Sequence, residues 1–262
     1  MRPSSGALPA AHRDLGALIA GGARAIFNLL LPPACVACLQ LLDDGDRGPV
    51  CGRCWSRVRA LPAPRCERCG HPADGYACRL CPLFPPWVRA LRAVCWMPGG
   101  RARDVVHALK YAGWGSVASG MAERMAQLEW PSDVIEERTA VIAVPLAASR
   151  ERERGYNQSE LLARHLAIHW NVPDWSAALR RTRATRTQTR LTPEARTRNV
   201  AGAFRVSPTE SCSLRGTHIV LVDDVLTTGA TVVACAAALR AAGVRVVSIV
   251  TFGRAPALGD PS

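Results

Sequence analysis

The sequence predicts an α/β fold, a parallel sheet with crossover helices, preceded by a small cysteine-rich segment. Three observations indicate it. Four Cys-x-x-Cys pairs are confined to the first third of the chain, apolar stretches of strand length alternate with amphipathic stretches of helix length from about residue 89, and one apolar stretch ends in two adjacent aspartates. With 262 residues, 48% of them hydrophobic, the chain can bury a core and form one or two domains.

Residues 1–30 are predicted to form an apolar tail with one short helix. Arg24 and Asn28 interrupt the apolar stretch and no small-x-small cleavage pattern follows it, which argues against a signal peptide. No apolar run reaches the ~18 residues of a membrane span. We therefore expect a soluble, cytoplasmic protein. The apolar positions near helical spacing are Leu15, Leu18, Ile19, Ile26, Phe27 and Leu30.

Residues 31–85 carry the pattern of a double zinc ribbon. Two thiolates separated by two residues hold one side of a tetrahedral ion, so two such knuckles complete a four-cysteine zinc site. Eight thiolates fill two sites and leave no open coordination position, which predicts structural Zn²⁺. Sequential and crossed pairings of the knuckles fit the spacing equally well. The pairs are Cys35 with Cys38, Cys51 with Cys54, Cys66 with Cys69, and Cys78 with Cys81.

Disulfides are the first alternative for these cysteines, and an iron–sulfur or redox site is the second. Without an export signal, zinc is favoured. The segment has few large apolar side chains, so bound metal would supply its stability, while contact of the ribbons with nucleic acid is the competing interpretation. His71, beside Cys69, is interpreted as a surface residue rather than a substitute ligand. The isolated Cys95, Cys212 and Cys235 are expected to be buried thiols.

Residues 89–255 are predicted to form the α/β domain. Apolar runs of strand length stand between amphipathic segments, which is typical of parallel strands joined by helices. Gly243 stands where the last helix is expected to end. Strands are predicted at residues 91–97, 140–144, 218–222 and 244–252, and helices at residues 102–113, 116–130, 159–170 and 231–243.

The most informative stretch is "IVLVDDVLTTGAT", residues 219–231. Asp223 and Asp224 follow a buried strand, at the edge where open α/β sheets bind ligands. The next residues combine hydroxyl side chains, a glycine and a helix start, which together form a cradle for a phosphate; they are Thr227, Thr228, Gly229, Ala230 and Thr231. Carboxylates repel phosphate and suit hydroxyl groups. The stretch therefore predicts a ribose 5-phosphate site.

Other known motifs in which an apolar strand ends in acidic residues do not match this sequence. A Walker B strand needs a Walker A motif, and no GxxxxGK[ST] is present. A haloacid-dehalogenase motif needs Asp-x-Asp, but Val225 follows Asp224. A receiver domain places its acidic residues on separate elements.

The stretch "VLVDDVLTTGAT" resembles the phosphoribosyl diphosphate (PRPP) motif of type I phosphoribosyltransferases. The resemblance implies that Asp223 and Asp224 hold the ribose hydroxyls and that residues 227–231 hold the 5-phosphate. It also implies that the loop in "AVIAVPLAASRERERGYNQSELLA" holds the diphosphate, although a charged surface loop would look similar. Its candidate residues are Arg150, Arg154, Gly155, Asn157 and Gln158.

A basic segment, residues 179–204, follows. Arg183, Arg186 and Arg190 are predicted to lie on a mobile cover over an anion, and a solvated loop or a nucleic-acid contact would show the same pattern. The chain carries 33 basic and 21 acidic residues, a net charge of +12, which favours phosphate-bearing partners or reflects a GC-rich genome. Lys110 is the only lysine.

Together the CxxC pairs, "RERGYNQSELLA", "QTRLTPEARTRNVAGAF" and the PRPP motif resemble the ComF (GntX-like) family over residues 27–253. The resemblance implies a double zinc ribbon joined to a type I phosphoribosyltransferase-like domain, Mg²⁺ with PRPP, and a link to competence proteins and incoming single-stranded DNA. "VVHALKYAGW" also resembles the family and makes Lys110 a candidate diphosphate contact, or simply a lysine on an amphipathic helix. Two functions follow: a phosphoribosyltransferase of unknown acceptor, or a nucleic-acid-handling accessory protein that keeps the site as a sensor or scaffold.

Overall fold

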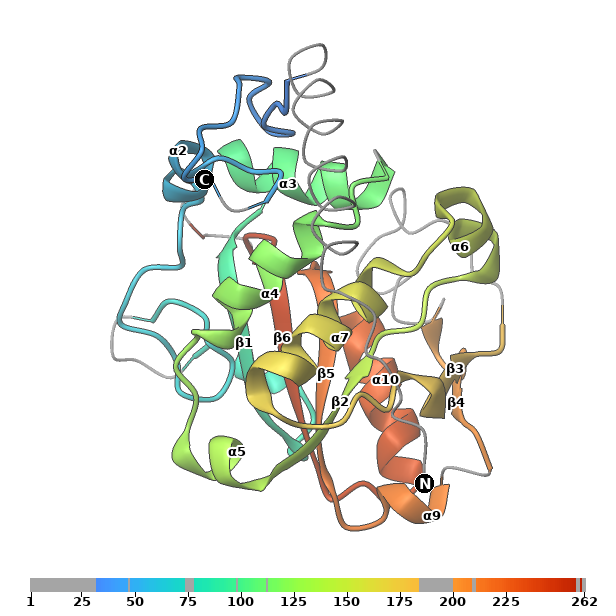
Figure 1. Ribbon diagram of the computed structural model, residues 1–262. Coiled ribbons are helices and arrows are strands. Elements are labelled where there is room, and N and C mark those ends of the chain that lie inside the picture. The colour runs from blue at the N-terminus through green and yellow to red at the C-terminus, as the bar shows by residue number, and fades with distance from the viewer. Residues whose placement is uncertain are drawn as a thin grey trace, which may run out of the picture.

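A parallel four-stranded sheet in the order β1-β6-β5-β2 forms the centre of the molecule (Figure 1). The computed structural model describes residues 32–46, 48–73, 78–97, 99–111, 113–183, 200–208, 211–257 and 260. The helix predicted within residues 1–30 and the predicted cover residues Arg186 and Arg190 lie outside these ranges. The strands are β1 (Val88–Trp96), β2 (Arg138–Ala143), β5 (His218–Leu226) and β6 (Val246–Arg254).

The two central strands are nearly continuous runs of β-branched and other apolar residues. Such runs are typical of parallel strands that are covered on both faces. In β5, residues 218–222 are all buried, and in β6 all residues from 247 to 254 are buried. The predicted parallel α/β class is therefore confirmed. β1 and β2 begin before the predicted bounds and β5 and β6 end after them, whereas β6 begins later than predicted.

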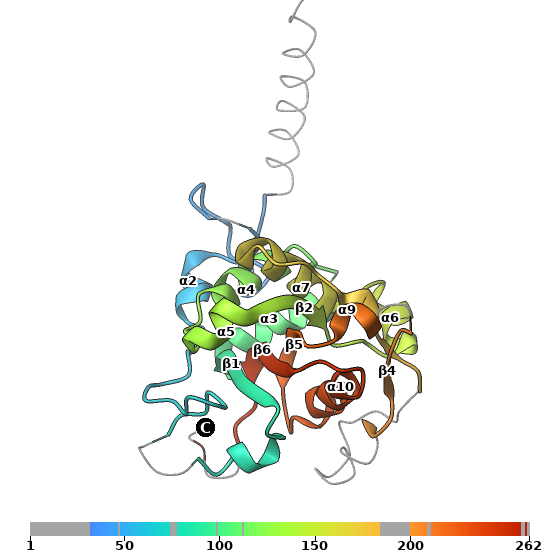
Figure 2. The same cartoon turned by 90° about the horizontal axis from the view of Figure 1, so that it is seen from below.

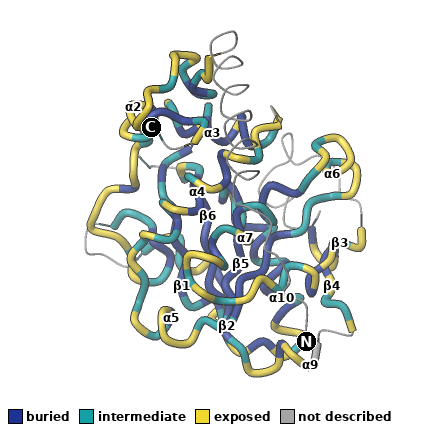
Figure 3. Tube along the Cα trace, viewed as in Figure 1, coloured by how far each residue is buried: buried dark blue, intermediate teal, exposed yellow. Residues whose placement is uncertain are grey.

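Helices cover both faces of the sheet (Figure 2). The first face carries α3 (Gly100–Tyr111), α4 (Val117–Ala126) and α7 (Gln158–Trp170), which share a core with Val220, Val222 and Val250. The opposite face carries α10 (Ala230–Ala241), which packs with Ile219, Leu221 and Ile249. Alternate residues of a strand thus enter two separate cores, and the burial of the sheet between them is visible in Figure 3.

Shorter elements connect these layers. They are α5 (Ser132–Glu137), α6 (Ala148–Arg154), a 3₁₀ turn η2 (Ser176–Ala178), the antiparallel pair β3 (Leu179–Arg181) and β4 (Phe204–Val206), and α9 (Ser211–Leu214). The sequence predicted a loop where α6 forms. This helix ends at Gly155, whose φ of +80° is the left-handed conformation that glycine adopts without steric penalty.

The cysteine-rich segment packs directly on the α/β domain. It contains α2 (Gly52–Ser56) and a 3₁₀ turn η1 (Cys81–Leu83). Its first half lies beside α3 and α4 and its second half beside β1, as the blue and cyan parts of Figure 1 show. Cysteines of the two halves belong to the cores on opposite faces of the sheet. The ribbons are thus part of the domain's packing rather than a separate unit.

Two further expectations concern the isolated cysteines and membrane spans. Cys95 and Cys235 are fully buried, as predicted, while the side chain of Cys212 lies outside the described residues. Among the helices that the structure describes, none has the length and apolar character needed to cross a bilayer.

Candidate functional site

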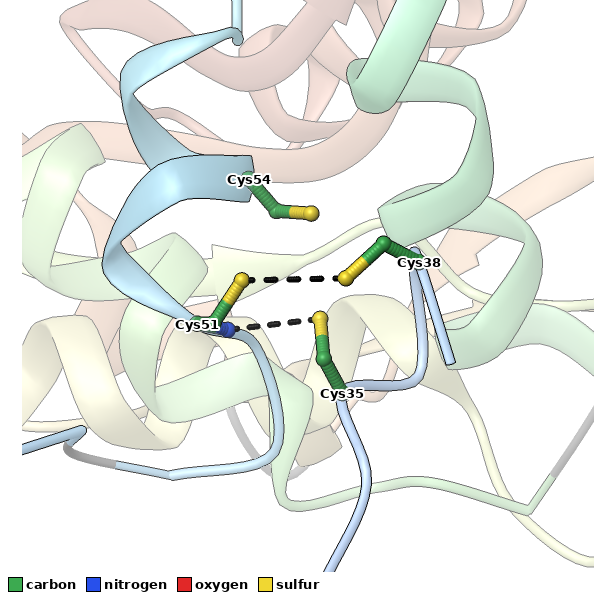
Figure 4. A group of neighbouring side chains, drawn as sticks. All are labelled: Cys35, Cys38, Cys51 and Cys54. Atoms are coloured by element: carbon green, nitrogen blue, oxygen red, sulfur yellow. Dashed lines mark hydrogen bonds between the residues drawn. The ribbon is translucent and has the colours of Figure 1, made fainter. Parts of the chain in front are cut away.

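The eight knuckle cysteines form two groups, and the pairing is sequential. Cys35, Cys38, Cys51 and Cys54 converge on one point (Figure 4), and Cys66, Cys69, Cys78 and Cys81 on another; within each group all sulfur atoms lie within 4.8 Å of one another. A tetrahedral zinc with Zn–S bonds of ~2.3 Å separates its sulfurs by about 3.8 Å. The Cys38–Cys51 and Cys66–Cys81 Sγ distances are 3.8 and 3.3 Å. Both groups therefore fit a structural zinc ion.

His71 does not belong to the second group. Its Nε2 lies 2.7 Å from Oδ1 of Asp260, and the exposed fractions of the two side chains are 12% and 6%. The interpretation of His71 as a non-ligand agrees with this geometry. Its interpretation as a surface histidine is wrong, because the contact with Asp260 covers the ring.

The aspartate pair lies where β5 extends beyond β2. The β2–β5 pairing ends at Ala143 and Val222, whereas β5 stays paired with β6 as far as Leu226. Asp223 and Asp224 are therefore inside β5, not after it as the sequence indicated. Because neighbouring strand residues point to opposite faces, the two carboxylates start on different sides of the sheet.

Asp224 lies on the face covered by α3. Its Oδ2 is 2.8 Å from Nζ of Lys110, in the last turn of that helix, and the carboxylate side chain is 6% exposed. A charge this deeply buried needs a partner close by. The structure thus brings together two of the predicted site residues that are far apart in sequence.

The carboxylate of Asp223 has a different partner, in the first turn of α7. Its Oδ1 accepts hydrogen bonds from Oγ of Ser159, at 2.8 Å, and from the backbone N–H of Asp224, at 2.9 Å. Burial, reinforced by the negative charge of Asp224, raises the pKa of the Asp223 carboxyl to about 7. A bound cation or additional hydroxyl donors would favour the ionised form.

The turn after β5 leads directly into α10. Gly229 is the N-cap of this helix with φ +80°, and its conformation lets the backbone turn into the first helical residue, Ala230. The N–H of Ala230 points at Oγ1 of Thr228, at 3.5 Å. A Cβ added to Gly229 would meet the ring of Phe84 at 3.2 Å, so the end of the zinc ribbon packs against this turn. The first N–H groups of a twelve-residue helix and the threonine hydroxyls suit an anion.

The predicted diphosphate residues divide into three groups. Arg154 donates to Oε1 of Gln158, at 2.8 Å, and its guanidinium lies 4.9 Å from the ring centre of Tyr111, next to Lys110. Asn157 is 3% exposed; its side chain caps α7 by accepting from the N–H of Ser159 and donates to Val144 O. Arg150 pairs with Glu153 on the exposed side of α6, at 2.7 Å. Arg154 and Gln158 are thus placed near α3, whereas Arg150 faces solvent.

Three residues of this region were not singled out in the sequence. Ser159 follows the predicted Gln158, and Tyr111 follows the predicted Lys110. Nothing in the sequence indicates that the hydroxyl of Ser159 would contact a carboxylate on another strand. Phe84 belongs to the punctuation after the last cysteine, and its contact with Gly229 depends on how the ribbon folds back. Of the predicted cover, Arg183 is described: it is exposed and donates to Ala201 O at 2.9 Å.

Comparison with known proteins agrees with both halves of the structure. Residues 26–83 match the double zinc ribbon domain family and residues 152–262 the phosphoribosyl transferase domain family. The DNA utilization protein YhgH of Escherichia coli is 34% identical over 233 residues, which cover 84% of this chain and 96% of that protein. Competence protein F of Haemophilus influenzae is 26% identical over 242 residues, with the same coverage. Competence protein ComFC of Bacillus subtilis is 24% identical over 202 residues, covering 74% and 78% of the two chains.

Fold and site together define a phosphoribosyltransferase-type domain that carries a structural double zinc ribbon. The chain belongs to the ComF family, as the length and identity of its match to the YhgH proteins show.

Proposed function

We propose that this protein binds PRPP with Mg²⁺ and transfers its phosphoribosyl group to an acceptor. The observation that carries the proposal is the continuous arrangement of β5, the turn and α10. It places two carboxylates and an anion-binding helix start within a few residues of one another. One ligand type, a ribose 5-phosphate with an activated C1, needs both chemistries at that spacing.

The protein's own residues would act by positioning and by charge. Residues 227–231 would hold the 5-phosphate at the start of α10. Asp223 and Asp224 would hold the ribose hydroxyls and balance positive charge that develops at C1. Arg154 and Lys110, at the facing ends of α6 and α3, would neutralise the departing diphosphate, for which Lys110 must exchange its present contact with Asp224.

Carboxylates are oxygen ligands that Mg²⁺ takes in proteins, and a cation bound here would favour the ionised form of the Asp223 carboxyl, whose pKa burial raises to about 7. Asp223 and Asp224 would therefore hold the ion, directly or through the ribose hydroxyls. Bound there, Mg²⁺ would neutralise the diphosphate and so make it a better leaving group.

A second candidate is a nucleic-acid-handling accessory protein in which the same site senses PRPP without turnover. The names of the relatives favour it, because they concern DNA utilization and competence. A cytoplasmic protein that meets single-stranded DNA or other competence proteins would use the same fold. Binding of single strands should then weaken steeply with salt.

The test is calorimetric titration of Mg²⁺-PRPP into the zinc-loaded protein. We expect binding by the parent and loss of binding by a variant with Asp223→Asn and Asp224→Asn. The matched control is Asp43→Asn with Asp44→Asn, an adjacent and exposed aspartate pair in the first ribbon, which removes the same charge. Absence of binding by the folded parent, or equal loss in the control, would refute a ribose-phosphate site at β5.

A further inference from the structure

A second anion site is suggested by the face of the molecule opposite α3. The pair β3–β4 and the C-terminal half of α10 border an open groove of about 770 Å³, which we call the hairpin groove. Figure 2 shows α10 and β4 on the side of the sheet away from α3, α4 and α7. The described residues that line it are Arg180, Thr182, Gly202, Phe204, Arg205, Val206, Ser207, Pro208, Ala238, Ala241 and Ala242.

Two arginines face each other across this hairpin. Arg180 and Arg205 are directly paired in the β3–β4 register, and both are exposed. Opposite residues in an antiparallel pair have Cα atoms about 5 Å apart, and like charges placed there repel and destabilise the hairpin. Neighbouring Arg181 does not share the arrangement, because its guanidinium stacks over the ring of Phe204 at 5.4 Å.

No acidic group in the described part of the chain offsets the repulsion between Arg180 and Arg205. Neither Arg180 nor Arg205 makes a hydrogen bond or ion pair with a described residue, and the described lining contains no carboxylate. The carbonyl end of α10 supplies only the partial negative charge of a helix terminus. Two adjacent guanidinium groups without an acidic partner fit a phosphate, which accepts two forked hydrogen bonds at once.

The floor of the groove indicates the rest of the ligand. Pro208 and three alanines at the end of α10 offer apolar surface in the same groove, and inorganic phosphate would leave that surface and most of the volume unused. The volume lies in the range of small-molecule sites. A polynucleotide path combines a longer basic track with exposed aromatic platforms, whereas the one aromatic ring in the described lining, Phe204, is buried beneath Arg181.

We propose that the hairpin groove binds a nucleoside phosphate, with the phosphate between Arg180 and Arg205 and the nucleoside on the apolar floor. The site is separate from residues 223–231 and does not depend on PRPP binding there. The two sites are joined by α10, whose first residue follows the phosphate turn and whose last residues line the groove.

The experiment measures the affinity of adenosine and uridine 5′-monophosphates, inorganic phosphate and a twelve-residue oligothymidylate by calorimetry. The test variant carries Arg180→Gln and Arg205→Gln. The control carries Arg103→Gln and Arg164→Gln, two exposed arginines of α3 and α7 on the opposite face. Neither variant changes residues 223–231, so any nucleotide bound there contributes equally to both.

We expect the test variant to bind at least one of the two nucleotides tenfold or more weakly than the parent, and the control to stay within twofold. Lysines at both positions should restore part of the affinity, because the charge returns without the fork. Ala241→Glu, an exposed change that adds a carboxylate to the floor, should weaken the same nucleotide while leaving the thermal melt unchanged.

The proposal would be overturned by equal nucleotide affinity in the test variant and the parent, by an equal loss in the control, or by a loss confined to the oligonucleotide. Phosphate binding as tight as the nucleotides would also contradict the role of the floor. A melt that falls in the test variant with no change in affinity would mean that the arginines serve only the hairpin.

Discussion

The two zinc-binding groups are chemically identical but are fastened to the domain in different ways. The first is held by apolar packing: Cys35, Cys51 and Cys54 are buried in the core of α3 and α4, and Trp55 packs against Phe252. The second also contacts a core, through Cys69, and is in addition held by arginines that donate to backbone carbonyls at that cysteine and just before it. Arg254 reaches Cys69 O at 2.6 Å, and Arg92 reaches Glu67 O at 2.8 Å. Both groups therefore contact a core, but the second has a larger share of arginine-to-carbonyl hydrogen bonds.

The largest effect is expected when one cysteine ligand is removed from either zinc-binding group, in two separate variants. Cys54→Ser and Cys69→Ser should each reduce zinc from two ions per chain to one, because three thiolates bind far more weakly than four. The loss in Cys54→Ser should exceed about 4 kcal/mol in the free energy of unfolding, since buried residues of that ribbon also leave the shared core. Elemental analysis and thermal melting measure both. If Cys69→Ser is the more destabilising change, the distinction drawn above is wrong.

The next effect concerns the packing of Trp55. Its ring lies under the guanidinium of Arg124, 3.7 Å from the ring centre, and touches Gly120 so closely that a Cβ there would come within 2.8 Å of it. Trp55→Ala should cost about 3–5 kcal/mol through the cavity it leaves. Trp114→Ala, at a 46% exposed tryptophan, is the control and should change stability by less than about 0.5 kcal/mol. Urea unfolding of the zinc-loaded proteins gives both values.

The folded domain is itself expected to lose stability at low pH, through His218, and this loss must be known before zinc release at low pH is compared between the two groups. Burial lowers the pKa of His218, at the start of β5, to about 4; nearby Glu137 partly opposes the shift. The unfolded chain protonates near pH 6.5 and the folded chain only near pH 4, so stability is lost as the pH falls between these values. By pH 4.5 the loss should be about 2 kcal/mol.

His218→Gln should reduce this loss, measured as the difference in unfolding free energy between pH 7 and pH 4.5. An amide can still bond to Ser248, the hydroxyl that now lies 2.9 Å from Nε2. His165→Gln is a comparison at a less buried histidine on α7 and should change the difference less. An unchanged pH dependence in His218→Gln would contradict the buried, neutral state.

The smallest effect tests the polar attachment of the second group. The Arg68 guanidinium donates to the carbonyls of Val88, Phe84 and Pro85, at 3.2, 2.9 and 2.6 Å. Arg68→Met keeps much of the aliphatic stem and should cost about 1–2 kcal/mol. Zinc should also leave the second group severalfold faster in a chelator assay, while release from the first is unchanged. Faster release from both groups would mean that they are coupled.

The fold class was predictable because long apolar strands and amphipathic helices are local patterns. The short elements were not: α6 is seven residues of mostly charged sequence, and β3 and β4 have three residues each. For the candidate site, the motif identified Asp223 and Asp224 but not their surroundings. The contacts of Lys110 and Ser159 depend on where β2 ends beside β5, which no property of the aspartates encodes. The zinc pairing was open in the sequence and is defined by the fold of the ribbons.

The extension of β5 beyond β2 makes the two aspartates non-equivalent. One carboxylate is the counter-ion of a helix lysine, and the other is a hydroxyl acceptor with a raised pKa. A single-residue insertion or deletion early in β5 would turn the strand by one position and exchange these two environments. The order of the two aspartates along the chain therefore matters, because strand register decides which carboxylate meets the lysine and which meets the hydroxyl.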